Sequence, residues 1–111
     1  MNFSIIPSDR FKKEAKRLTK KFPSLKQELD DLNEVLEKYP EIGIPLGNDS
    51  YKIKLTVKSK GKGKSGGARI ITYLLINNKE VYLLTIYDKS ELDSIDNKTI
   101  KAIIQGLNVG K

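Results

Sequence analysis

The amino-acid sequence predicts a single α+β domain: an N-terminal strand and an antiparallel helix pair, then a three-stranded antiparallel meander and a short C-terminal helix. Apolar residues recur at helical spacing up to residue 39, three β-branched and aromatic runs follow between 50 and 87, and a last helical pattern begins at 96. At 111 residues the chain is long enough for one core and too short for two. Residues 1–111 are therefore expected to form one domain.

The first expected element is a short strand over residues 2–6. This apolar segment stops at Pro7, which has no N–H to donate to a sheet. Ser8 or Asp9 can cap the helix that follows, which is expected to end near Phe22. Its apolar face is predicted to contain Phe11, Ala15 and Leu18, with lysines and arginines on the other face.

A second helix is predicted to end at Tyr39, just before Pro40. Pro23 suits its first turn and Ser24 can help to cap it. One stripe of the helix is apolar and is expected to pack in the core; it contains Leu25, Leu29, Leu32, Leu36 and Tyr39. The outer face is acidic, so it would complement the basic outer face of the first helix if the two lie side by side.

The meander is predicted from three apolar runs that follow a loop over residues 40–49. The strands are expected over 50–57, 68–76 and 80–87, and the last two are joined by the compact turn Asn-Asn-Lys. Apolar residues alternate with Lys52, Lys54 and Thr56 in the first strand, so these lysines share one face. Asp96 can cap the C-terminal helix, and Gly106 and Gly110 would fray its end.

Composition excludes several classes of function. The chain has no cysteine and no histidine, so it can form neither a disulfide framework nor a zinc site of ordinary ligation. No metal or cofactor is expected, and any catalysis must use Lys, Arg, Tyr or carboxylate side chains. There is no apolar run of signal-peptide or membrane-spanning length, so we expect a cytoplasmic protein that does not enter the membrane.

The positive charge is concentrated in one hairpin. Between residues 52 and 69 there are seven basic residues and no acidic one, which equals the formal net charge of +7 for the whole chain. These residues are Lys52, Lys54, Lys58, Lys60, Lys62, Lys64 and Arg69. Such a localised positive field favours a polyanion as partner, and nucleic acid is the leading candidate.

The hairpin residues divide into two groups by position. Lys52, Lys54 and Arg69 lie on predicted strands, where their geometry is fixed, so they are the candidates for chemistry on one concave basic surface. Four lysines lie on or near the turn and would grip RNA or the ribosome: Lys58, Lys60, Lys62 and Lys64. The turn is not a Walker-type phosphate loop, because it lacks the four-residue spacer. A solvated turn without function is the competing interpretation.

Three segments resemble the RelE/ParE superfamily of bacterial type II toxins, and the closest resemblance is to the RelE and HigB mRNA interferases. They are YKIKL at 51–55, GGARIITY at 66–73 and LLTIYDKSE at 83–91. The resemblance implies a metal-independent endoribonuclease that cleaves mRNA in the ribosomal A site by attack of the 2′-hydroxyl on the phosphate. It also implies inhibition by a cognate antitoxin that represses the operon, and so an indirect association with operator DNA.

By this resemblance, Lys52 and Lys54 match lysines of the RelE strand and would act as base or electrostatic stabiliser. Arg69 matches the arginine that opens the next strand and would clamp the scissile phosphate.

RelE-like enzymes commonly carry a further arginine and a C-terminal tyrosine, where this chain has Ser90 and Asp96. Tyr87 and Lys89 are the nearest substitutes, and this pattern resembles the HigB branch. Tyr87 could equally close the core beneath the site.

Two other functions are compatible with the sequence. A ParE-like toxin would inhibit gyrase by binding protein, and a plain RNA-binding module would cleave nothing. The first hypothesis, a ribosome-dependent ribonuclease, is favoured because the basic residues converge on the meander rather than on a helix.

Overall fold

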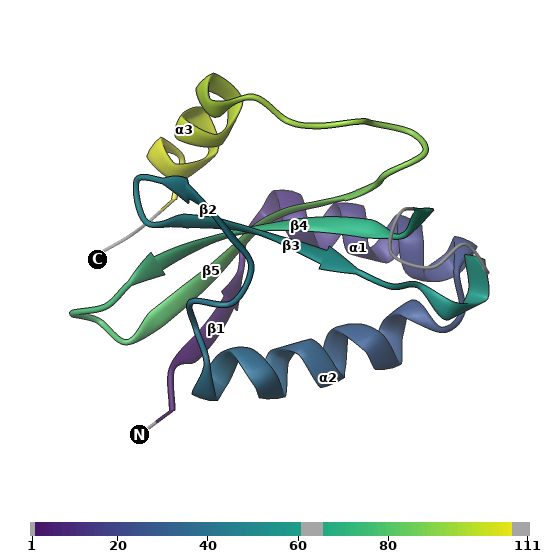
Figure 1. Ribbon diagram of the computed structural model, residues 1–111, viewed down its shortest axis with the longest axis horizontal. Helices are drawn as coiled ribbons and strands as arrows, with labels where there is room; N and C mark the ends of the chain where they lie inside the picture. Colours follow the sequence, from purple (N-terminus) through teal and green to yellow (C-terminus); the bar gives the residue numbers. More distant parts are fainter. Residues whose placement is uncertain (1, 61–65, 108–111) are drawn as a thin grey trace.

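The computed structural model describes residues 2–60 and 66–107, which form one five-stranded sheet with helices on both faces (Figure 1). The strand order is β1-β5-β4-β3-β2. The elements in chain order are β1 (Ser4–Pro7), α1 (Asp9–Lys21), α2 (Leu25–Lys38), β2 (Ile44–Gly47), β3 (Ser50–Leu55), the 3-10 turn η1 (Lys58–Lys60), β4 (Ala68–Leu75), β5 (Glu80–Asp88) and α3 (Asn97–Gln105).

The predicted α+β architecture is confirmed, and so are the caps of the first and last helices. The Ser8 hydroxyl accepts a hydrogen bond from the N–H of Phe11 at 3.0 Å, and Asp96 accepts one from the N–H of Thr99 at 2.8 Å. Each cap satisfies a backbone donor that the first helical turn leaves unpaired. β3, β4 and β5 form the predicted antiparallel meander.

Two features of the sheet were not predicted. The segment 40–49 was expected to be a loop, but it contains β2, which pairs with β3 at the edge of the sheet. Pro45 is compatible with an edge strand, because its missing N–H can face away from the ladder. At the other edge β1 runs parallel to β5, a pairing between distant segments that local sequence does not reveal.

The start of α2 also differs from the prediction. Pro23 lies before the helix, and the side chain of Ser24 makes no capping bond. Its hydroxyl instead lies 2.8 Å from that of Ser59 and 3.2 Å from a carboxylate oxygen of Glu28. These contacts connect the start of α2 to η1. At the other end of the helix, Tyr39 was expected in the core-facing stripe, but it lies just after the last helical residue and is 64% exposed.

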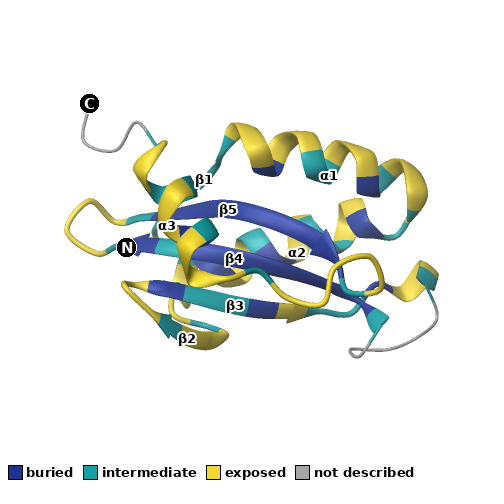
Figure 2. Ribbon diagram, turned by 90° about the horizontal axis from the view of Figure 1, so that it is seen from above, coloured by how far each residue is buried: buried dark blue, intermediate teal, exposed yellow. Residues whose placement is uncertain are grey.

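Apolar side chains fill both faces of the sheet. α1 and α2 cover one face, where a cluster contains Leu18, Leu36, Ile70 and Ile86. α3 lies on the opposite face, over a second cluster that contains Ile71, Tyr82, Leu84, Tyr87 and Ile100. β4 and β5 are buried along most of their length (Figure 2).

A bulge in β5 changes which side chains face α3. Ile71 pairs with Thr85 and Thr72 with Leu83, so Leu84 has no partner on β4. A bulge of this kind reverses the alternation of side chains beyond it. Tyr87 therefore lies on the α3 side of the sheet, whereas strict alternation from Leu83 would place it on the side of α1 and α2.

Candidate active site

Three of the predicted site residues lie in one row across the three central strands, near one end of each strand. Lys54 on β3 pairs with Arg69 on β4, and Arg69 pairs with Tyr87 on β5. Directly paired residues on antiparallel strands share a face, with Cβ atoms about 5 Å apart. Tyr87 belongs to the same apolar cluster as Ile100 of α3, so the row lies on the α3 side of the sheet.

Lys52 lies on the same face as this row, two residues before Lys54. It pairs with Ile71, another member of the cluster under α3, and its side chain is half-buried whereas Lys54 is exposed. The sequence-based prediction that Lys52 and Lys54 share a face is thus confirmed.

Arg69 is buried, with a relative exposure of 4%. We expected it on an open basic surface, and that expectation is wrong because β4 is a central strand covered on both faces. Its guanidinium donates a hydrogen bond to the carbonyl oxygen of Ala68 at 3.2 Å. Because it is shielded from water, its charge acts more strongly on neighbouring groups than that of an exposed arginine would.

Tyr87 combines burial with an unsatisfied hydroxyl. Burial raises the pKa of Tyr87, the positive charge of Arg69 lowers it in part, and Asp93 raises it again. The phenol is therefore protonated at neutral pH and can donate a hydrogen bond or a proton. Among the residues that the structure describes, none hydrogen-bonds to this hydroxyl. A buried polar group without a partner is costly, and this hydroxyl can form a hydrogen bond with a ligand.

Lys89 continues the site beyond the end of β5. Its N–H donates to the carbonyl of Gly67 at 3.0 Å, and its ammonium group pairs with the carboxylate of Asp93. A hydrogen bond from Lys89 and the charge of Lys89 lower the pKa of Asp93, and Lys52 adds to this effect.

Asp93 is thus close to three predicted site residues, yet sequence reasoning missed it. It lies in the linker between β5 and α3, where no periodic pattern marks a functional side chain. The only available signal was its four-residue spacing from Lys89.

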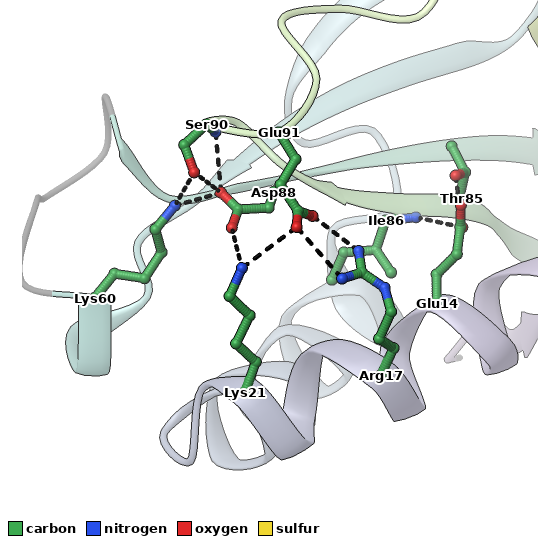
Figure 3. Close-up of polar contacts among 9 residues, drawn as sticks. All are labelled: Glu14, Arg17, Lys21, Lys60, Thr85, Ile86, Asp88, Ser90 and Glu91. Carbon is green, nitrogen blue, oxygen red and sulfur yellow. Dashed lines mark hydrogen bonds and ion pairs between the residues drawn. The ribbon is translucent and has the colours of Figure 1, made fainter.

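The lysines of the turn occupy different environments. Lys58 is exposed on η1, whereas Lys62 and Lys64 lie outside the described residues. The Lys60 side chain is only 7% exposed, and its ammonium group pairs with the buried carboxylate of Asp88 (Figure 3). Lys60 was expected to grip RNA or the ribosome from the turn, but an ion pair holds its ammonium group inside the protein.

Ser90 and Asp96 have local structural contacts. The hydroxyl and N–H of Ser90 donate to Asp88 at 2.7 and 3.0 Å, and Asp96 caps α3. Within residues 2–60 and 66–107, no group of acidic side chains is arranged to hold a metal ion. Over the same ranges, no helix has the length and apolar character needed to cross a bilayer.

No family model matches the chain. Solved structures do match it: a mutant of the Escherichia coli toxin RelE in the free state aligns with a TM-score of 0.64 and 17% identity, over 96% of this chain and 100% of that one. The chain has the fold of the RelE toxins. The RelE-like fold that the sequence motifs implied is thereby confirmed, and it includes the helices as well as the meander.

Two further RelE structures contain an antitoxin. A RelE mutant bound to a peptide of the antitoxin RelB aligns with a TM-score of 0.57 and 21% identity, over 96% of this chain and 99% of that one. The intact E. coli RelBE toxin–antitoxin complex aligns with a TM-score of 0.53 and 26% identity, over 78% and 95% of the two chains. The closer relation to the HigB branch stays a prediction.

Proposed function

We propose that this chain is the toxin of a type II toxin–antitoxin system and that it cleaves mRNA on the ribosome without a metal ion. The observation that carries the proposal is the row Lys54–Arg69–Tyr87, which brings a lysine, an arginine and a protonated phenol together on a RelE-like sheet. These groups can supply a base, a phosphate-binding cation and a proton donor for RNA cleavage in a chain without histidine.

In the proposed reaction, the 2′-oxygen attacks the adjacent phosphorus and the bond from phosphorus to the 5′-oxygen breaks. The products are a 2′,3′-cyclic phosphate and a 5′-hydroxyl. The amine of Lys54 or Lys52, in its neutral form, accepts the proton of the 2′-hydroxyl, and the hydroxyl of Tyr87 donates a proton to the leaving 5′-oxygen. Arg69 stabilises the negative charge that develops on the phosphate, and Lys89 supports it electrostatically.

Binding to RNA and the ribosome is assigned to the basic turn and its surroundings. Lys58 is exposed, and we propose that Lys62 and Lys64 contribute as well. Lys60 is left out of this set because its side chain is only 7% exposed and its ammonium group is paired with the buried carboxylate of Asp88. The protein would act in the cytoplasm, where ribosomes and mRNA are found.

We also propose that a cognate antitoxin binds this chain and associates it indirectly with operator DNA. RelE itself is bound by RelB in two of the similar structures, and a net charge of +7 suits an acidic or amphipathic partner segment. Co-expression with the neighbouring open reading frame tests this proposal. Rescue of growth by a small partner protein is the expected result, and toxicity that persists with every neighbouring frame would contradict it.

The decisive experiment is a cleavage assay with purified chain and ribosomes programmed with end-labelled mRNA. We expect cleavage in the A site with 2′,3′-cyclic phosphate ends, and its loss in Lys54→Ala and Arg69→Ala. Lys12→Ala is the matched control, because Lys12 is an exposed lysine on α1, away from the row.

The same assay separates the competing functions. RNA binding without cleavage by the wild type would favour a non-catalytic RNA-binding module. Intact mRNA and translation, together with inhibited DNA supercoiling by gyrase, would favour a ParE-like toxin.

A further inference from the structure

Asp88, at the end of β5, receives contacts from three separate segments (Figure 3). Its Oδ1 accepts hydrogen bonds from the ammonium of Lys60 and from the hydroxyl and N–H of Ser90, at 2.7 and 3.0 Å for the two Ser90 donors. Its Oδ2 lies 3.8 Å from the ammonium of Lys21 at the end of α1. The residue is only 2% exposed, so these contacts are shielded from water.

Lys60 is enclosed on its other side by an aromatic ring. Its ammonium nitrogen lies 5.4 Å from the centre of the Phe22 ring, a cation–π distance. A buried ion pair is a weak source of net stability, but removing one partner leaves a buried charge without compensation. The Lys60–Asp88 pair therefore defines where the end of η1 sits.

Hydrogen bonds to α2 hold the rest of η1. The N–H of Ser59 donates to the hydroxyl of Ser24 at 2.9 Å, and the N–H of Lys58 donates to Glu28 at 2.8 Å. These bonds fix η1 to the start of α2. On the other side, Lys60 fixes η1 to Asp88 at the end of β5 and to the hydroxyl of Ser90 just beyond it.

Asp88 also lies between two proposed site residues. Tyr87 precedes it and belongs to the cluster under α3, whereas the carboxylate of Asp88 points toward Lys60 and Lys21. Lys89 follows it and is bonded through its N–H to Gly67 at the start of β4. A displacement of Asp88 would therefore move Tyr87 and Lys89 relative to η1.

We propose that Asp88 is a positioning residue for RNA binding, which through Lys60 holds η1, with its exposed Lys58, beside the Tyr87–Lys89 end of the site. The inference rests on the proposed function and adds a residue that does not itself touch RNA. It makes a counter-intuitive prediction, because removing an acidic residue from a basic protein ordinarily strengthens binding to RNA.

The test compares Asp88→Asn with Glu91→Gln. Each variant adds one positive unit to the net charge of +7, and both residues belong to the network in Figure 3. Glu91 is the matched control, because it is exposed and pairs with Arg17 and Lys21 but not with Lys60. The probe is a short single-stranded RNA whose 2′-hydroxyls are methylated, so that it binds without being cleaved.

We expect Asp88→Asn to bind this RNA about tenfold more weakly than the wild type, while Glu91→Gln binds equally or more tightly. Asp88→Asn binding as tightly as Glu91→Gln would overturn the inference while leaving the proposed function intact. A wild type that neither binds nor cleaves RNA would overturn both.

Ser90→Ala keeps the test decisive if Asp88→Asn does not fold. This variant changes no charge and removes the two hydrogen bonds of the Ser90 hydroxyl, which donates to Asp88 at 2.7 Å and accepts from the ammonium of Lys60 at 3.4 Å. We expect about twofold weaker RNA binding and faster amide exchange at Lys60, whose N–H donates to Val57 at 3.0 Å. Unchanged binding together with unchanged exchange at Lys60 would contradict a positioning role.

Discussion

The carboxylate of Glu14 on α1 accepts a hydrogen bond from the hydroxyl of Thr85 on β5 at 2.7 Å. The same oxygen accepts a second bond from the N–H of Ile86 at 3.1 Å. β1 pairs with β5 only as far as Leu83, so the edge of β5 beyond it has no strand partner. At that edge, next to the bulge at Leu84, Glu14 supplies the acceptor for a backbone N–H that no strand pairs with. The bulge in turn brings Tyr87 to the face that carries Lys54 and Arg69.

Glu14→Ala should destabilise the protein and reduce cleavage together. The N–H of Ile86 and the hydroxyl of Thr85 would lose their acceptor, at a cost of about 1–3 kcal/mol in the free energy of unfolding. Urea denaturation measures the loss, and Glu34→Ala, an exposed glutamate on α2, is the control. A variant with wild-type stability and cleavage would show that the bulge does not depend on Glu14.

Tyr87→Phe should separate activity from stability. The hydroxyl is buried without a hydrogen-bond partner among the described residues, so its removal should leave the free energy of unfolding unchanged or slightly increased. Loss of a proton donor should slow single-turnover cleavage by about 100-fold or more. Tyr51→Phe, on the face covered by α1 and α2, should cleave at the wild-type rate. Full activity of Tyr87→Phe would restrict Tyr87 to packing.

Asp88 should make the protein sensitive to acid. Burial alone would raise the pKa of Asp88, but hydrogen bonds from Lys60 and Ser90 outweigh it and lower the pKa from 3.8 to about 2. Because the folded-state pKa is depressed, the stabilisation is fully present above about pH 4 and is lost as the pH falls toward about 2. Its size is about 2 kcal/mol, at 1.36 kcal/mol per pKa unit.

Asp88→Asn should lack the part of the acid sensitivity that comes from protonation of Asp88. Denaturant unfolding between pH 5 and pH 2, at about one-unit steps, gives the difference between the wild-type and variant curves. Asp30→Asn, an exposed change of the same charge on α2, should follow the wild type. Parallel curves for the wild type and Asp88→Asn would mean that the Lys60–Asp88 pair contributes nothing in the folded state.

Gly67→Ala should be strongly destabilising. A Cβ atom at this position would lie 2.1 Å from the carbonyl oxygen of Leu55, which is backbone and cannot move aside easily. Overpacking of this kind costs about 1–3 kcal/mol, and here it would also disturb the hydrogen bond from Lys89 to Gly67. Thermal unfolding measures the loss of stability. Gly106→Ala, whose Cβ would meet nothing closer than 3.5 Å, is the control and should unfold at the wild-type temperature.

Local sequence pattern was sufficient to predict the helices and the meander. The periods of a helix and a strand are properties of neighbouring residues, so the spacing of Phe11 and Leu18 and the alternation around Lys52 and Lys54 were enough. The same alternation placed both lysines on one face, and the motifs around them indicated a RelE-like fold.

Only the tertiary structure decided which charges are available to a ligand. The sequence places three of the seven basic residues of the hairpin on strands and four on or near the turn. It does not show that Arg69 is buried in a central strand or that Lys60 is paired with Asp88, 28 residues away. The face of Tyr87 depends on a bulge that Glu14 supports from 71 residues earlier in the chain. Contacts between such distant residues leave no periodic trace in the sequence, because they arise only when the strands and helices pack together.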